Sequence, residues 1–128
     1  MIELTMANLI HIPLEIGIYK IYALNNGLGI SIQRFANTDE SGLLYIGQTS
    51  RQTLRKRVYN FLLTASPHLN TKNHSGALKY RINPVIQKTL SEHKLYIVFE
   101  TCENPLFREG ELISNYKAIF GECPILNK

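Results

Sequence analysis

Residues 43–61 read LLYIGQTSRQTLRKRVYNF, and this stretch decides the fold that we expect for the chain. Its first part, up to Gly47, is an apolar run containing a β-branched and an aromatic residue, which is typical of a buried strand. After a short polar turn, Leu54, Val58 and Phe61 recur at the spacing of one face of a helix. The stretch therefore predicts a strand that leads directly into an amphipathic helix.

The predicted helix spans about Gln52 to Ala65, with Ser50 as its N-cap. Basic residues crowd its first turns, where the helix dipole favours acidic ones. These residues are Arg51, Arg55, Lys56 and Arg57. An anionic partner is the simplest reason for this charge.

On the N-terminal side, residues 17–24 are β-branched and aromatic and end at an Asn-Asn-Gly turn, which predicts a strand. Residues 25–41 are rich in turn formers and predict a long loop with a short extra strand at 29–34. The strands at 17–24 and 42–47 are expected to pair as a wide antiparallel hairpin. Residues 1–15 are expected to be an extension, with a short helix near 4–10, that packs on the sheet.

On the C-terminal side, the pattern predicts three more helices and one more strand. Helices are expected at Ser75–Ile82, from Pro84 to about Leu90 with Asn83 as N-cap, and from Pro105 to about Phe120, between an Asn104 cap and Gly121; the strand is Lys94–Thr101. The order β-β-α-α-β-α predicts a single α+β domain over residues 1–128, a three-stranded antiparallel sheet flanked by helices.

The charge distribution indicates a polyanion partner. The chain of 128 residues has a formal net charge of +4 and a sequence pI near 9.1. The segment 51–94 holds the basic residues Arg51, Arg55, Lys56, Arg57, Lys72, Lys79, Arg81, Lys88 and Lys94 against the single acid Glu92. Such a positive face suits a phosphate backbone, although a merely solubilising face is the alternative. The expected nucleic-acid contacts are Arg51, Arg55, Lys56, Lys72, His74, Lys79 and Arg81.

The location expected from the sequence is the cytoplasm. Cys102 and Cys123 have no metal-ligand spacing and form no dense framework, which fits a reducing compartment. The N-terminus lacks the basic region of a signal peptide, and no apolar stretch approaches the length of a membrane span.

Several residues have the chemistry of a phosphodiester-cleaving site, and each also has an ordinary structural interpretation. Tyr19 and Tyr45 could lie on one face of the hairpin, or could simply pack there. Arg57 could grip a phosphate, Glu109 could hold a cation, and Asn127 could bond back into the site. Each would also be unremarkable as a solvated side chain or a chain end.

The order of these residues resembles the GIY-YIG nuclease superfamily over most of the chain. The matching elements are Gly17-Ile18-Tyr19, Tyr45-Ile46-Gly47, Leu54-x-x-Arg57, Glu109-x-x-Leu112-Ile113 and Pro124-x-x-Asn127. Both tripeptides are unaltered.

The resemblance implies a role for each matching residue. Tyr19 would be the general base that takes a proton from the attacking water, helped by Tyr45 and Arg57. Glu109 would hold one Mg²⁺ or Mn²⁺ ion per active site, and Asn127 would brace the site. The implied reaction is hydrolysis of a DNA phosphodiester that leaves 5′-phosphate and 3′-hydroxyl ends.

The chain departs from the family pattern in three places. The segment 20–44 is longer than the usual short hairpin and is similar to the restriction-enzyme branch. Phe61 stands where many members have His or Tyr, so His74 or Tyr59 would have to substitute. The run after the last helix is also longer, which leaves Glu111 as a second candidate metal ligand beside Glu109.

We therefore expect a Mg²⁺-dependent endonuclease acting on double-stranded DNA, with a small restriction endonuclease working as a homodimer as the best fit. A structure-selective or mobile-element nuclease is the closest enzymatic alternative, and an RNA-directed nuclease stays open. The alternative from another class is a catalytically inactive DNA-binding module with the same fold.

Overall fold

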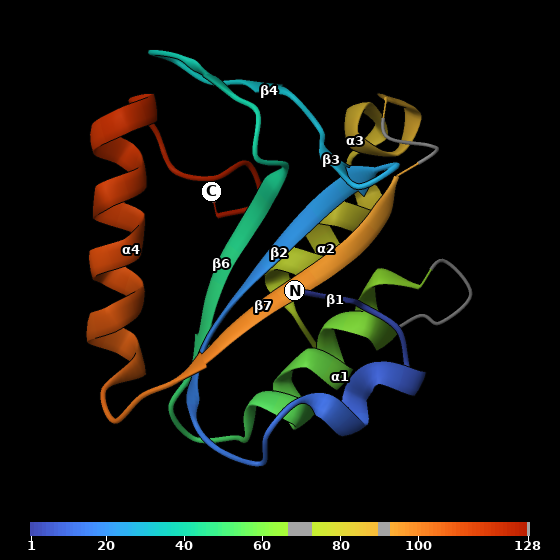
Figure 1. Ribbon diagram of the computed structural model, residues 1–128, viewed down its shortest axis with the longest axis vertical. Coiled ribbons are helices and arrows are strands. Elements are labelled where there is room, and N and C mark those ends of the chain that lie inside the picture. Colours follow the sequence, from blue (N-terminus) through green and yellow to red (C-terminus); the bar gives the residue numbers. More distant parts are fainter. Residues whose placement is uncertain (67–72, 90–92, 128) are drawn as a thin grey trace.

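The computed structural model describes residues 1–66, 73–89 and 93–127, apart from the side chains of 85, 88 and 89. It is an α+β domain (Figure 1). Its elements are β1 (Ile2–Glu3), the 3₁₀ helix η1 (Ala7–His11), β2 (Gly17–Asn25), β3 (Leu28–Gly29), β4 (Ile32–Gln33), β5 (Thr38–Asp39), β6 (Leu43–Thr49), α1 (Leu54–Ala65), α2 (Ser75–Ile82), α3 (Pro84–Thr89), β7 (Lys94–Thr101) and α4 (Pro105–Phe120).

The sheet is antiparallel and is built around β2. β7 pairs with β2 from Gly17 to Leu24, and β6 pairs with the other edge of β2 from Gly17 to Tyr22. β1 adds to the outer edge of β7, and β3 pairs with the last residues of β2. The sheet thus has five strands, and the prediction of three was wrong. The two extra strands are only two residues long, too short to show an alternating pattern.

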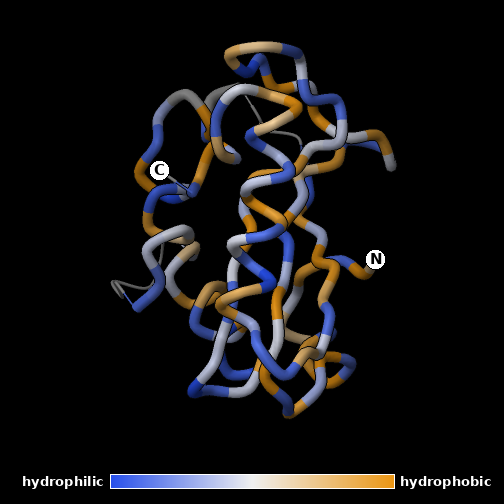
Figure 2. Tube along the Cα trace, turned by 90° about the vertical axis from the view of Figure 1, so that its left-hand side faces the viewer, coloured by the Kyte–Doolittle hydropathy of each residue, from blue (hydrophilic) through white to orange (hydrophobic). Residues whose placement is uncertain are grey.

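Helices cover both faces of this sheet (Figure 1). Tyr19, Ile21 and Ala23 alternate along β2 with no exposed surface. The first two pack in a core shared with Leu54 and Val58 of α1. On the other side, Ile46 packs with Tyr116 of α4. Hydrophobic and hydrophilic residues follow each other closely along the chain in Figure 2.

Helix α1 begins two residues later than the sequence predicts. α1 starts at Leu54, and its N-cap is Thr53, whose side chain accepts from the Lys56 amide. Ser50 is therefore not the cap. Its hydroxyl instead donates to the side-chain oxygen of Gln48. Thr49 closes the turn before the helix, because its hydroxyl donates to the carbonyl of Gln52 and accepts from the Gln52 amide.

The other helix boundaries follow the local signals. α2 and the strand β7 have the predicted bounds. α4 begins after Asn104, whose side chain caps the Phe107 amide, and ends at Gly121 with φ of 80°. At the N-terminus, buried Leu4 and Ile12 pack on the core, so the expected docking of the extension is confirmed. Among the described residues, none of the helices is long and apolar enough to cross a membrane.

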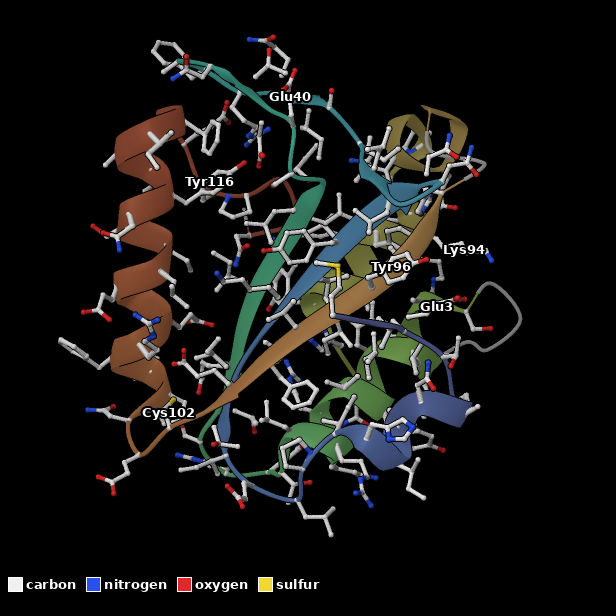
Figure 3. The ribbon with its side chains drawn as sticks, viewed as in Figure 1. Glu3, Glu40, Lys94, Tyr96, Cys102 and Tyr116 are labelled. Atoms are coloured by element: carbon white, nitrogen blue, oxygen red, sulfur yellow. The ribbon has the colours of Figure 1, made fainter. Side chains whose placement is uncertain are left out.

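The loop at 25–41 is anchored to the far end of α4. β4 pairs with β5, and the Ala36 amide donates to the carbonyl of Phe120. The buried Asp39 accepts from the hydroxyl of Tyr116 at 2.6 Å. Figure 3 shows Tyr116 on the side of α4 that faces β6. Because Glu109 lies seven residues earlier in the helix, about 10 Å along its axis, the loop is separated from that carboxylate.

Candidate active site

The two motif tyrosines lie on one face of the sheet. Tyr19 of β2 is opposite Gly47 of β6, and Ile21 is opposite Tyr45, so the tyrosines are diagonal neighbours. Their ring centroids are 6.0 Å apart. Tyr19 has no exposed surface, whereas Tyr45 is partly exposed. The register therefore brings the two rings together as the sequence predicts, with Tyr45 on the more open side.

Two glycines make room for these rings. A Cβ atom at Gly47 would lie 2.5 Å from Cζ of Tyr19 and 2.6 Å from the ring of Tyr45. A Cβ atom at Gly76, in the first turn of α2, would lie 2.7 Å from the Tyr45 ring. All three distances are far inside van der Waals contact, so the glycines allow strand and helix backbones to approach the aromatic pair. Sequence reasoning did not find Gly76, whose one signal is a residue of low helix propensity inside a helix.

His74 completes this aromatic cluster from the start of α2. Its Nε2 lies 2.5 Å from the hydroxyl oxygen of Tyr19, and its Nδ1 accepts from the Ala77 amide at 3.2 Å. The ring packs edge-on against Tyr45 and Phe61, with centroid distances of 5.4 and 5.0 Å. His74 therefore places a polar ring between Phe61 and the two tyrosines.

Arg57 brings the positive charge of the site from α1. It is half-buried, and its Nη1 donates to the carbonyl of Asn73 at 3.1 Å. Burial and the neighbouring Tyr45 raise the pKa of Tyr19 well above its ordinary value, while the charge and hydrogen bonding of Arg57 lower it. Burial and then Glu109 raise the pKa of Tyr45, and Arg57 again opposes this. Arg57 is thus placed to stabilise a phenolate.

Glu109 provides the negative charge from α4. Burial raises the pKa of this half-buried carboxyl, and its charge in turn raises the pKa of both tyrosines. Glu111 behaves differently, because it accepts a 2.7 Å ion pair from Arg108 on the exposed surface of the helix. The structure therefore gives Glu109, rather than Glu111, electrostatic contact with the tyrosines.

A single carboxylate limits how a metal ion could be held. Within residues 1–66, 73–89 and 93–127, no three His, Cys, Asp or Glu side chains gather as a self-sufficient metal site. A Mg²⁺ ion is commonly bound by one or two carboxylates, with water and substrate phosphate oxygens as its other ligands. Glu109 fits that manner of binding and does not fit a permanent structural ion.

Asn127 forms hydrogen bonds with the backbone of strand β6. Its Oδ1 accepts from the Ile46 amide at 2.9 Å, and its Nδ2 donates to the Ile46 carbonyl at 2.7 Å. Ile46 lies between Tyr45 and Gly47 on β6. The asparagine thus satisfies the backbone of this strand on the edge that faces away from β2 and fixes it next to the tyrosine.

The basic residues divide into exposed and structurally engaged ones. A groove of about 430 Å³ is lined by Gln48, Thr49, Ser50, Arg51, Gln52, Arg57 and Leu106. Lys56 is exposed, with its amine 5.2 Å from the Tyr59 ring centroid. Arg55, in contrast, donates to the carbonyls of Ile10 and Ile12.

The remaining expected nucleic-acid contacts differ in their positions. Lys79 and Arg81 are half-buried on α2. His74 has no exposed surface, so it offers no contact to a nucleic acid from its position in the cluster. Lys72 lies outside the described residues. Of the basic residues, Arg51 and Arg57 line the groove, and Lys56 is exposed on α1.

Comparisons of the chain with family models, with curated proteins and with solved structures find no match.

Proposed function

We propose that this chain is a Mg²⁺-dependent endonuclease of the GIY-YIG type that hydrolyses DNA phosphodiesters. The observation that supports it is the electrostatic coupling of Tyr19, Tyr45, Arg57 and Glu109, which come from four different elements. Their order along the chain is the order that the sequence resemblance requires. Perturbed ionisable groups concentrated at one place are typical of a catalytic site.

The tyrosine pair would act as the base. The two hydroxyls interact, so the pair loses one proton to solvent as a unit. A water molecule attacks phosphorus as its proton moves to the phenolate oxygen, and the bond from phosphorus to the 3′ oxygen breaks. The 3′ oxygen then takes a proton from solvent, which leaves a 3′-hydroxyl and a 5′-phosphate. The resemblance makes Tyr19 the acceptor of the proton from the attacking water. Because Tyr19 is enclosed, we expect this proton to be taken up at Tyr45.

The other site residues would stabilise charge and geometry. Arg57 would offset the negative charge on the phenolate and on the phosphate. Glu109 would hold one Mg²⁺ or Mn²⁺ ion, which when bound supplies positive charge for the scissile phosphate and the leaving oxygen. Asn127 would keep the Tyr45 strand in place through its two bonds to Ile46.

Double-stranded DNA is the substrate that the surface supports best. The groove beside Arg57 combines two arginines with the amides of Gln48 and Gln52, groups that bind phosphates and base edges. We therefore infer a small restriction endonuclease that works as a homodimer with one site per strand. The two free cysteines are compatible with a cytoplasmic location.

A cleavage assay tests the proposal. The purified chain is incubated with supercoiled and linear DNA, and with RNA of equal sequence, in Mg²⁺, Mn²⁺ or EDTA. We expect discrete DNA fragments with either metal and none with EDTA, and a fall of about 10²-fold or more in Tyr19→Phe and Glu109→Ala.

Other outcomes lead to the alternative functions. Cleavage of branched DNA alone would indicate a structure-selective nuclease, and preference for RNA would indicate an RNA-directed one. Binding without cleavage would indicate an inactive DNA-binding module. Cleavage that survives both substitutions would contradict the proposed site. In a parallel binding assay, Arg51→Gln should reduce the slope of log affinity against log salt by about 0.9.

A further inference from the structure

The enclosed ring of His74 is held at both nitrogens. It has no exposed surface, and it is the N-cap of α2, with Nδ1 accepting from the Ala77 amide. A ring nitrogen that accepts an N–H bond bears no proton. If the ring is neutral, its single proton must therefore be on Nε2.

The surroundings of His74 keep the ring neutral. Burial, reinforced by the positive charge of Arg57, lowers the pKa of His74 to about 3. The other groups that face the ring are Tyr19, Tyr45 and Phe61, none of which is charged in the resting site. A neutral imidazole with an unprotonated Nδ1 has its proton on Nε2. The hydrogen bond of 2.5 Å therefore runs from His74 Nε2 to the oxygen of Tyr19.

This direction has a consequence for the second tyrosine. Because Tyr19 accepts from His74, its own hydroxyl proton is directed elsewhere, and Tyr45 is the neighbouring phenol. Hydrogen bonding to Tyr19 lowers the pKa of Tyr45, in opposition to burial. Tyr45 is also the partly exposed member of the pair.

We propose that His74 is a positioning residue that directs a hydrogen-bond chain from the Ala77 amide through His74 and Tyr19 to Tyr45. The chain stabilises the phenolate at its exposed end, where a proton from water would enter, and polarised chains of this kind strengthen each member. The proposal rests on the proposed nuclease function. In the superfamily that the sequence resembles, many members have His or Tyr at the position of Phe61. The proposal assigns the supporting role of that residue to His74, at the start of α2.

A second tyrosine–histidine pair in the molecule provides the control. The hydroxyl of Tyr80 lies 2.6 Å from Nε2 of His93. The buried Nδ1 of His93 has no hydrogen-bond partner among the described residues, so no contact there fixes the tautomer. His93 also lies outside the tyrosine site.

Nuclear magnetic resonance of ¹⁵N-labelled imidazoles tests the direction of the bond without any cleavage. We expect His74 to show a protonated Nε2 and an unprotonated Nδ1 from about pH 5 to about pH 8, the range in which an ordinary histidine titrates. A protonated Nδ1, or titration of the ring within this range, overturns the proposal.

Two substitutions separate the functions of the two ring nitrogens. In His74→Asn the amide oxygen can still cap α2, but the short side chain no longer donates to Tyr19. In His74→Gln the longer side chain returns an N–H donor near the Nε2 position. We expect kcat to fall about 10²-fold in His74→Asn and less than about 10-fold in His74→Gln. The pH at which kcat rises should move upward in His74→Asn, and His93→Gln should leave kcat unchanged.

A double substitution tests whether His74 acts through Tyr19. In a Tyr19→Phe background, His74→Asn should cost less than about 2-fold, because the acceptor has already been removed. Wild-type cleavage combined with equal losses in His74→Asn and His74→Gln, or with additive losses in the double variant, overturns the role of His74 and leaves the proposed function standing. Absence of cleavage by the wild-type chain overturns the proposed function and this role with it.

Discussion

Two groups of buried polar side chains lie toward opposite ends of α4, and they are satisfied in different ways. At the C-terminal end, Asp39 accepts from the amide and hydroxyl of Ser41 and from Tyr116. Nearby, Arg34 pairs with Glu122 at 2.9 Å. Both carboxylates of this anchor cluster thus have a donor or a cation as partner, whereas the buried Nε of Arg34 has no hydrogen-bond partner among the described residues. These contacts hold the long loop at the C-terminal end of α4.

In the tyrosine site at the other end, the cation Arg57 and the anion Glu109 both act on the tyrosines, but the carboxylate has no direct partner in the part of the chain that the structure describes. Glu109 has no hydrogen bond or ion pair among the described residues, and its charge opposes ionisation of Tyr19 and Tyr45. A half-buried carboxylate next to two phenols lowers stability unless a cation joins them. The anchor cluster thus ties the loop to the fold, whereas in the proposed function the Glu109 carboxylate is available to a cation.

The largest expected effect is loss of activity in Glu109→Gln. The substitution keeps the shape of the side chain but removes the charge that would hold the metal, so cleavage should fall about 10²- to 10³-fold. The fold should be unaffected or slightly more stable, because a buried charge without a partner is removed. Single-turnover cleavage and urea denaturation measure the two quantities.

Glu111→Gln is the matched control for Glu109→Gln. It breaks only an exposed ion pair with Arg108, which contributes little to stability because water and salt screen it. Equal losses of activity in the two variants would contradict the assignment of Glu109.

Acid should destabilise the protein through His74. The folded-state pKa of about 3 is below the ordinary value of 6.5, so the unfolded chain binds a proton first as the pH falls. Stability from the neutral ring is complete above pH 6.5 and is lost as the pH falls toward 3. The linkage amounts to at most about 3 kcal/mol at pH 4. Urea denaturation at neutral and acid pH should show a smaller loss of unfolding free energy on acidification in His74→Gln than in wild type. Equal losses in the two proteins would refute the role of His74 in acid destabilisation.

Gly47→Ala should damage the tyrosine site by overpacking. The added Cβ would meet the ring of Tyr19 at 2.5 Å, which forces that ring or the strand to move. We expect a loss of about 2 to 3 kcal/mol in unfolding free energy and about 10-fold or more in cleavage. Gly110→Ala is the control, since its Cβ would have open space, and a better helix former there should stabilise by about 0.5 to 1 kcal/mol. Unchanged activity in Gly47→Ala would show that the ring position is not critical.

The sequence predicted what depends on local signals. Asn104 and Gly121 mark the ends of α4 because capping acts within a few residues, and the two tyrosines share a face because strands alternate with a period of two. The N-cap of α1 was predicted at Ser50 and is Thr53, because the hydroxyl of Thr49 closes a turn that delays the start of the helix. The bond between Tyr19 and His74 joins residues 55 positions apart, and such a pairing is set by packing of α2 and not by either local pattern.

Tyr116→Phe should have the smallest effect of these substitutions, and it tests the anchor cluster. It removes the hydroxyl that donates to Oδ2 of Asp39 and leaves both Ser41 donors in place. Because the acceptor is buried, we expect a loss of about 1 kcal/mol in unfolding free energy. Cleavage per folded molecule should not change, since the anchor cluster takes no part in the proposed chemistry. A fall in kcat with unchanged stability would show instead that the loop and the tyrosine site are coupled through α4.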